Sequence, residues 1–175
     1  SNSASTANHE LTHTFGLAHA AYFDCGDEIV ESECSTEEYG DNFDVMGYTY
    51  SSSPHLNAVH KHALGWFYEL DDSGNYDWDN FSDWEIWIQR VLVPDDGAIY
   101  EIVPIESTNE GDWKTLGIGA GQDYEWDTYY IEYRRPIGHD EELLETFEIP
   151  DSAFEGVFIH SNYNPQFDYY YADSY

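Results

Sequence analysis

The sequence predicts an α+β protein, with helices in its first part and strands in the rest. Residues 3–17 and 54–64 carry helix-type spacing and helix stop signals. After about residue 84, segments rich in β-branched and aromatic residues alternate with turn residues, which is typical of strands. The turn-rich stretch 71–75 (DDSGN) separates the part with helix-type spacing from the part with strand-type segments. We therefore predict one domain over residues 1–68 and a β-rich domain over residues 69–175.

The composition supports a folded chain and excludes several kinds of partner. Hydrophobic residues make up 41% of the 175 residues, which is enough for a core. No apolar run reaches the length of about eighteen residues that would cross a membrane. Only 5 Lys plus Arg oppose 36 Asp plus Glu, for a formal net charge of −31. A surface this acidic repels phosphate, which argues against nucleic-acid partners and against docking on anionic membranes.

The same negative charge is compatible with two kinds of environment for the protein. Self-repulsion destabilises a compact acidic chain, and salt screens that repulsion. One hypothesis is adaptation to high ionic strength, such as seawater or brine; the other is an ordinary acidic secreted protein. Bound divalent cations such as Ca²⁺ would also offset the charge, and the acidic runs 95–96 and 140–142 are unspecific candidate sites.

A short segment near the start carries the clearest chemical signal. Residues 9–19 read HELTHTFGLAH. His9 and His13 are four residues apart, so a helix places both imidazoles on one face, where they can hold one zinc ion. Gly16 is suited to end the helix at positive φ and to let His19 return as a third ligand. Three neutral imidazoles leave a fourth position open for water, which is typical of catalytic zinc.

Glu10 lies next to His9 and is the candidate general base. The alternative is a solvated helix whose histidines align by chance. The short pattern HExxH occurs in ordinary helices, whereas the extended pattern also fixes the glycine and the third histidine and is far more specific. The sequence therefore favours a zinc site made by His9, His13 and His19.

Residues 44–47 (DVMG) contain the one methionine of the chain, Met46. Together with the histidines this resembles the metzincin zinc endopeptidases, in which a tight turn after the zinc motif carries a methionine beneath the metal. Within metzincins the chain is most similar to the gametolysin-like group, through residues 38–41 (EYGD), 63–66 (ALGW) and 130–134 (YIEYR). The alternative for Met46 is that it merely fills a gap in a core.

The resemblance implies the C-terminal half of a metzincin catalytic domain, with active-site helix, Met-turn and closing helix, followed by an antiparallel β-sandwich-like module. It also implies a twisted β-sheet upstream of the active-site helix. Only eight residues precede His9, so we expect a piece without that sheet, which could be inactive alone. As a relative of secreted proteases, the protein is expected outside the cell or in the cell wall.

The acidic loop 20–43 holds both cysteines of the chain, Cys25 and Cys34. In an extracellular protease we expect them to form a disulfide, within a loop that walls the active-site cleft. The alternative is a pair of thiolate ligands for a metal, although the zinc site already has three imidazoles.

Tyr48, two residues after Met46, is a candidate for stabilising the oxyanion, because some metzincins have a tyrosine at this spacing that reaches the zinc; the alternative is plain packing. Ser53 and the proline after it then predict the start of the helix 54–64, which should stop at Gly65. Three histidines on this helix are expected to be surface or packing residues: His55, His60 and His62.

The β-rich part contains four predicted strands, over residues 85–93, 98–105, 128–134 and 156–160. The glycine-rich stretch 117–121 is expected to be a flexible turn. His139 and His160 are expected to have structural or surface roles. Strands without clear helices between them predict an antiparallel sandwich-like arrangement.

The function predicted from these residues is hydrolysis of peptide bonds in extracellular proteins or glycoproteins, with zinc-activated water and Glu10 as general base. One alternative is a catalytically silent zinc-holding module whose acidic β-rich half binds a partner or cations; the intact Glu10 speaks against it. Another is a gluzincin-type aminopeptidase, in which a distant glutamate replaces the third histidine. His19 at the metzincin spacing disfavours that alternative.

Overall fold

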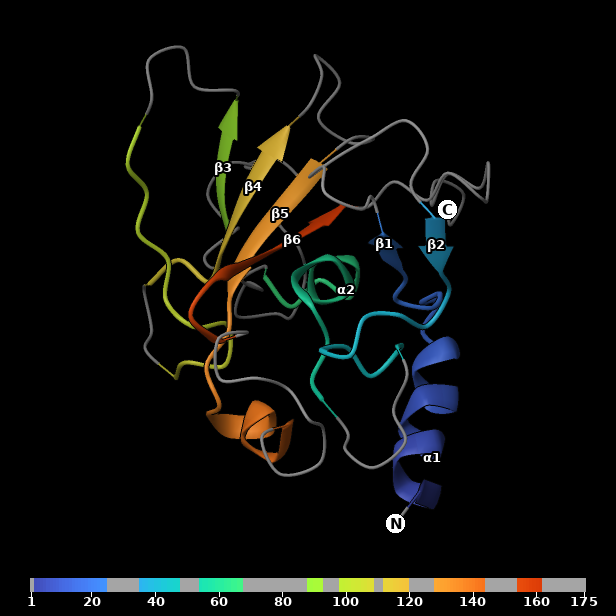
Figure 1. Cartoon of the computed structure of the whole chain (residues 1–175). Helices are drawn as coiled ribbons and strands as arrows, with labels where there is room; N and C mark the ends of the chain where they lie inside the picture. The colour runs from blue at the N-terminus through green and yellow to red at the C-terminus, as the bar shows by residue number, and fades with distance from the viewer. Residues whose placement is uncertain are drawn as a thin grey trace, which may run out of the picture.

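The computed structural model describes residues 2–24, 35–47, 54–67, 88–92, 98–108, 112–119, 128–143 and 154–161. The elements are α1 (Asn2–His13), β1 (Tyr22–Asp24), β2 (Ser35–Glu37), α2 (Ala58–Ala63), β3 (Ile88–Leu92), β4 (Thr115–Gly119), β5 (Thr128–Tyr133), the 3₁₀ helix η1 (Gly138–Glu142) and β6 (Val157–Ser161). Figure 1 shows α1 and the β1–β2 pair on one side, a four-stranded sheet on the other, and α2 between them. No helix in these stretches has the length and apolarity needed to cross a membrane.

The larger sheet has the strand order β3-β4-β5-β6. β4 pairs antiparallel with β5, and β5 pairs antiparallel with β6, whereas β3 runs parallel to β4. These elements confirm the α+β class. The prediction of a wholly antiparallel arrangement is wrong at the β3–β4 pair, because the chain crosses over between these two strands and does not form a hairpin.

The first helix ends earlier than predicted. Beyond His13 the backbone N–H groups bond three residues back, the last being Gly16 N to His13 O at 3.0 Å. The hydroxyl of Thr14 donates to the Leu11 carbonyl at 2.6 Å and so competes with a further helical turn. Gly16 takes φ +88°, which confirms its predicted role in turning the chain.

The second helix begins later than predicted, at Ala58. Asn57 is its N-cap, with an extended backbone and a side-chain oxygen that accepts from His60 N at 3.0 Å. The predicted cap, Ser53, lies outside the described residues. Gly65 follows the helix with φ +74°, as the sequence predicts.

Three predicted strands are confirmed by β3, β5 and β6. The predicted strand over 98–105 is wrong, because that segment makes isolated bonds instead of a ladder, Val103 N to Trp113 O and Ile105 N to Tyr133 O, both 2.9 Å. The predicted turn over 117–121 is also wrong for its first residues, which form the end of β4. β4 lies between β3 and β5, and these neighbours supply the pairing that two glycines do not favour on their own.

Two clusters of buried apolar side chains form the core. The first contains Leu17, Ala20, Val45, Met46 and Leu56 and lies next to the predicted metal ligands. The second contains Ala58, Phe67, Ile88, Ile105 and Tyr130. Its members come from both predicted domains, so residues 1–68 and residues 69–175 share a core through α2 and the sheet.

A buried ion network fixes α2 to the sheet. Arg134, Glu132 and Asp140 are all fully buried. Arg134 Nε donates to Glu132 Oε1 at 2.6 Å, and its Nη1 donates to Asp140 Oδ1 at 3.0 Å. The other oxygen of Glu132 accepts from Ala58 N at 2.6 Å, at the first residue of α2. Each charge here depends on its partners, since burial removes it from water.

A second polar contact joins α2 to the segment before β4. Glu106 forms an ion pair with Lys61 and accepts from His55 Nδ1 at 2.6 Å. Burial acts to raise the pKa of Glu106, but the hydrogen bond from His55 and the charge of Lys61 outweigh it and lower the pKa from 4.5 to about 2.

The variant Arg134→Ala should lower the free energy of unfolding by about 3–5 kcal/mol, because it removes the cation that neutralises two buried carboxylates. The matched control is Arg135→Ala, since Arg135 is exposed and its loss should change stability by no more than about 0.5 kcal/mol. Urea unfolding of the three proteins measures both effects. Equal stability of the two variants would contradict the buried network.

Glu106 should make stability depend on pH in the acid range. Because its folded-state pKa lies below 4.5, its contribution is present above pH 4.5 and is lost as the pH falls through about 2. The parent should therefore lose about 3 kcal/mol more between pH 5 and pH 2 than Glu106→Gln does. Glu101→Gln, at an exposed site, should keep the parental pH profile. Urea titrations at several pH values test this, and parallel profiles for all three proteins would refute it.

Candidate metal centre

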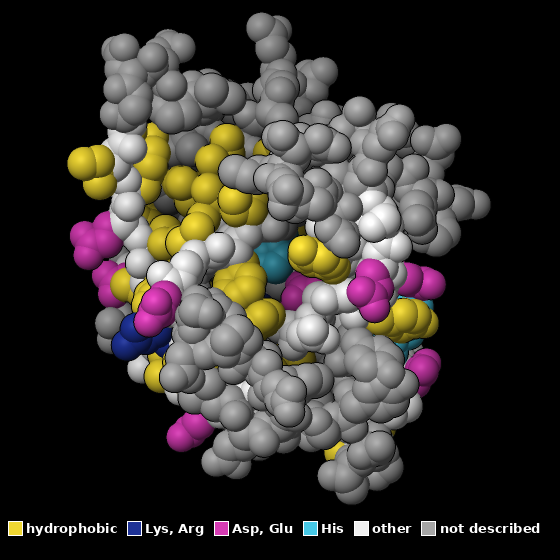
Figure 2. Space-filling view, viewed as in Figure 1, with side chains coloured by type: hydrophobic (Ala, Val, Ile, Leu, Met, Phe, Trp, Pro, Cys, Tyr) yellow, Lys and Arg dark blue, Asp and Glu magenta, His cyan; other side chains and the backbone are white. Residues whose placement is uncertain are grey.

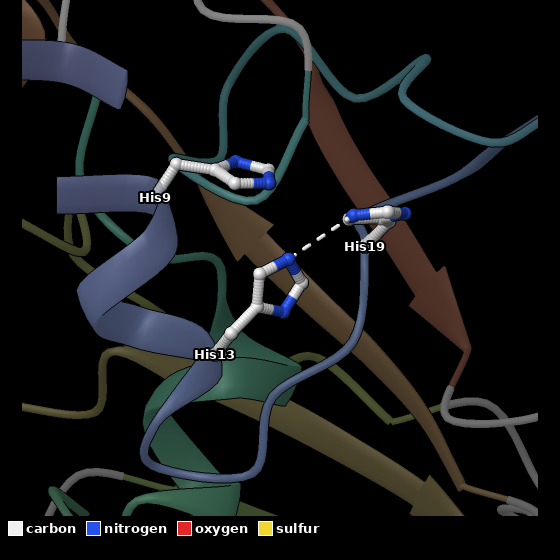
Figure 3. Close-up of side chains that lie close together, drawn as sticks. All are labelled: His9, His13 and His19. Carbon is white, nitrogen blue, oxygen red and sulfur yellow. Dashed lines mark hydrogen bonds between the residues drawn. The ribbon is translucent and has the colours of Figure 1, made fainter. Parts of the chain in front are cut away.

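The structure brings the three predicted ligands together. His9 and His13 lie one turn apart on α1, and His19 follows the turn at Gly16. Their ligand nitrogens all lie within 4.8 Å of one another. Figure 3 shows the three rings converging on one point, two from the helix and one from the chain beyond it.

The Nδ1 atom of each histidine has an acceptor. His9 Nδ1 lies 2.9 Å from the Val45 carbonyl oxygen, and His13 Nδ1 lies 2.8 Å from the Leu17 carbonyl oxygen. His19 Nδ1 lies 2.8 Å from Glu38 Oε1. A carbonyl or carboxylate oxygen can only accept, so each Nδ1 must carry the proton. In the neutral rings, Nε2 is then a bare lone pair on all three histidines.

These lone pairs face one another. His13 Nε2 and His19 Nε2 are 3.2 Å apart, and neither can donate to the other while both rings are neutral. A cation between them removes the repulsion. Two nitrogens on one tetrahedral zinc ion, each at about 2.0–2.1 Å, are about 3.3 Å apart, which matches this spacing. The spacing of His13 and His19 therefore fits a zinc ion bound through Nε2, and His9 offers a third nitrogen within 4.8 Å of both.

The turn that carries Met46, the predicted Met-turn, lies next to the histidine cluster. Met46 is fully buried, in the same cluster as Leu17 and Ala20, which flank His19 in the chain. Its carbonyl accepts from Ala20 N at 3.0 Å. The carbonyl of Val45, one residue earlier, is the acceptor for His9. The turn thus fixes the position of one predicted ligand on α1 and of the segment that carries the third predicted ligand.

Asp44 ties this turn to α2. It is fully buried. One of its oxygens accepts from Met46 N at 2.6 Å, and the other accepts from Asn57 N at 2.6 Å and from His60 Nδ1 at 2.9 Å. Burial acts to raise the pKa of Asp44, but the charge and hydrogen bond of His60 and the two backbone N–H groups outweigh it and lower the pKa.

Three other side chains border the histidines. Glu10 lies exposed on α1, one residue after His9. Tyr39 lies with its ring centroid 4.0 Å from that of His19, and Glu38 forms the bond to His19 described above. Glu38 and Tyr39 enter the sequence analysis only through the resemblance of residues 38–41. No local sequence pattern predicts their contact with the histidines, because a loop separates the two segments in the chain.

The remaining predicted residues divide into two groups. Tyr48, Cys25 and Cys34 lie outside the described residues, and so does the acidic pair 95–96. The histidines expected to pack or to lie at the surface make contacts away from the cluster: His55 with Glu106, His60 with Asp44, His62 with Tyr130, His139 with His55, and His160 with Glu132. Asp140 of the run 140–142 is paired with Arg134.

Comparison with known proteins identifies the family. A family model described as gametolysin peptidase M11 matches residues 2–175. The chain belongs to the gametolysin peptidase family. This confirms the resemblance to the gametolysin-like group, and the match extends over both predicted domains. Comparisons with curated proteins and with solved structures found no match.

Membership in a peptidase family makes proteins the expected class of substrate. The surface of this gametolysin-family chain is consistent with its composition: on the face in Figure 2, acidic side chains are dispersed over the described surface and basic ones are scarce. Among the described residues, the three-histidine cluster is the one group of at least three His, Cys, Asp or Glu side chains that could hold a metal ion.

Asp44→Asn should lower the free energy of unfolding by about 1–3 kcal/mol, because its amide nitrogen cannot accept a hydrogen bond and one of the two backbone N–H groups that Asp44 binds loses its acceptor. Asn42→Ala, in the same turn but exposed, should stay within about 0.5 kcal/mol of the parent. Thermal or urea unfolding measures the difference. An Asp44→Asn protein as stable as Asn42→Ala would show that Asp44 does not hold the turn.

Proposed function

We propose that this gametolysin-family chain is a zinc-dependent endopeptidase that acts on extracellular proteins, with His9, His13 and His19 as the metal ligands. The observation that carries the proposal is the set of three Nδ1 hydrogen bonds, which leave Nε2 unprotonated on three neutral histidines whose ligand nitrogens lie within 4.8 Å of one another. A helix that merely displayed histidines to solvent would not need an acceptor behind each ring. Three neutral nitrogen donors with no carboxylate among them form the donor set of a catalytic zinc site.

When bound, zinc supplies a Lewis acid that lowers the pKa of water and polarises the scissile carbonyl. Glu10 is the general base in this proposal. It takes a proton from the attacking water and then gives it to the leaving amine. Its place next to His9 on α1, with an exposed side chain, supports this role, because the base must reach both water and substrate.

Other residues of the chain hold this arrangement without taking part in proton transfer. Met46 fills the space beneath the ligands, and Asp44 keeps its turn in place. We also propose Tyr48 as a group that stabilises the oxyanion, on the resemblance to metzincins alone. We also propose a disulfide between Cys25 and Cys34, because this pairing is expected in an extracellular protease.

The proposed substrates are extracellular-matrix or cell-wall proteins and glycoproteins, and the proposed location is outside the cell. The family supports protein substrates, and the formal net charge of −31 disfavours phosphate-bearing partners. The matrix or cell-wall class and the location are proposed on the resemblance to secreted proteases alone. A high-salt environment is a further proposal on the same charge, since salt screens the self-repulsion of the folded chain.

The test combines zinc content and turnover in three variants. Glu10→Gln should keep about one zinc per chain and lose about 10²–10⁴-fold in turnover, because the general base is gone. His13→Ala should lose both zinc and turnover, because two imidazoles hold the ion poorly. His139→Ala is the control: His139 is exposed and stacks on His55, away from the cluster, so it should match the parent.

Elemental analysis and cleavage of an unfolded protein substrate give the two readouts. Full turnover in Glu10→Gln would remove Glu10 as the base. Equal zinc in His13→Ala and the parent would remove the three-histidine site and with it the proposed function.

A further inference from the structure

The third ligand differs from the other two in what holds its backbone. His9 and His13 lie on α1, where helical hydrogen bonds fix their Cα positions. His19 lies beyond the Gly16 turn, outside any helix or strand, and its side chain is 22% exposed. A ligand on irregular backbone loses more conformational freedom when it binds an ion, unless its ring is already held.

Glu38 holds one edge of this ring. Its Oε1 lies 2.8 Å from His19 Nδ1, and its side chain is 58% exposed. The carboxylate selects the tautomer with the proton on Nδ1, so Nε2 is directed at the cluster. A negative oxygen behind an imidazole also makes the other nitrogen a better donor to a cation. His9 and His13 have neutral backbone carbonyls in the same place.

Tyr39 holds the face of the same ring. The centroids of Tyr39 and His19 are 4.0 Å apart with 37° between the planes, whereas Tyr39 is 6.1 Å from His9. Consecutive residues thus contact the edge and the face of one imidazole. This restricts both the tilt of His19 and its rotation.

The fold places these two residues through the small sheet. β1 pairs with β2 in the register Tyr22 to Glu37, so residue 38 leaves the sheet close to the segment before β1. A tight turn follows, with Gly40 N bonded to Glu37 O at 3.0 Å. A Cβ at Gly40 would lie 2.4 Å from Tyr22 Cβ, so the turn needs glycine there. Asp41 N then bonds to the carbonyl of Ala20, the residue after His19, at 3.1 Å.

We propose that Glu38 is a positioning residue for His19, which raises the metal affinity of the centre through the charge and direction of its carboxylate. The proposal rests on the three-histidine site of the proposed function and extends it to a side chain that does not touch the metal. It makes the β1–β2 pair part of the metal centre, because that pair determines where Glu38 lies.

The experiment compares the parent chain with Glu38→Ala, Glu38→Gln and the control Glu37→Ala. Zinc affinity is measured by competition with a chromophoric chelator. Glu38→Ala should bind zinc about 10-fold more weakly, at the lower end of the usual range because the carboxylate is exposed. Glu38→Gln should fall in between, since its amide oxygen still accepts from Nδ1 but carries no charge. Glu37 is exposed on β2, and its replacement should leave the affinity within about twofold of the parent.

A second readout separates positioning from general destabilisation. The absorption spectrum of the Co²⁺-bound protein reports the geometry of the ligands. This spectrum should differ from that of the parent in Glu38→Ala, lie close to it in Glu38→Gln and be the same as the parent's in Glu37→Ala. Unfolding of the metal-free proteins should be the same in all four. If Glu38→Ala binds zinc as tightly as the parent and has the same Co²⁺ spectrum, the positioning role of Glu38 is wrong, whereas the proposed function stands. A parent that binds no zinc would overturn the proposed function as well.

Discussion

The proposed metal centre depends on the protonation of three Nδ1 atoms, because only this tautomer leaves the Nε2 atoms of all three histidines free to bind one cation. The acceptors come from separate parts of the chain: the Leu17 carbonyl follows α1, the Val45 carbonyl lies in the Met-turn, and Glu38 follows β2. The site is therefore complete only when all three segments are in place. Without a cation, the 3.2 Å approach of His13 Nε2 and His19 Nε2 is unfavourable. The free energy of folding thus offsets part of the free energy needed to bring the ligands together before a metal ion binds.

A chain of buried polar contacts connects this centre to the sheet. Asp44 joins the Met-turn to the start of α2, and Glu132 on β5 accepts from Ala58 N at the same helix end. Arg134 then neutralises Glu132 and is itself held by Asp140. Buried carboxylates cost free energy unless each has its partners, so these contacts define one relative placement of turn, helix and sheet. The described β-rich part thus supports the centre through hydrogen bonds as well as through the shared apolar core.

The parts of the centre with local signals could be predicted from the sequence. Helical periodicity places His9 and His13 on one face, and Gly16 is needed at positive φ before His19 can return. The acceptors could not be predicted, because a backbone carbonyl has no sequence signature and Glu38 reaches His19 across a loop. The sheet follows the same rule. β5 was predictable from its own residues, whereas β4 contains two glycines and exists because β3 and β5 pair with it on either side.

X-ray absorption at the zinc edge tests the central claim most directly, because it reports the atoms bound to the ion in the parent chain. The predicted spectrum contains about three imidazole nitrogens at roughly 2.0–2.1 Å, with one further light atom from water. Scattering from sulfur at about 2.3 Å would contradict the account, because it would mean that Cys25 and Cys34 bind the ion in place of the histidines.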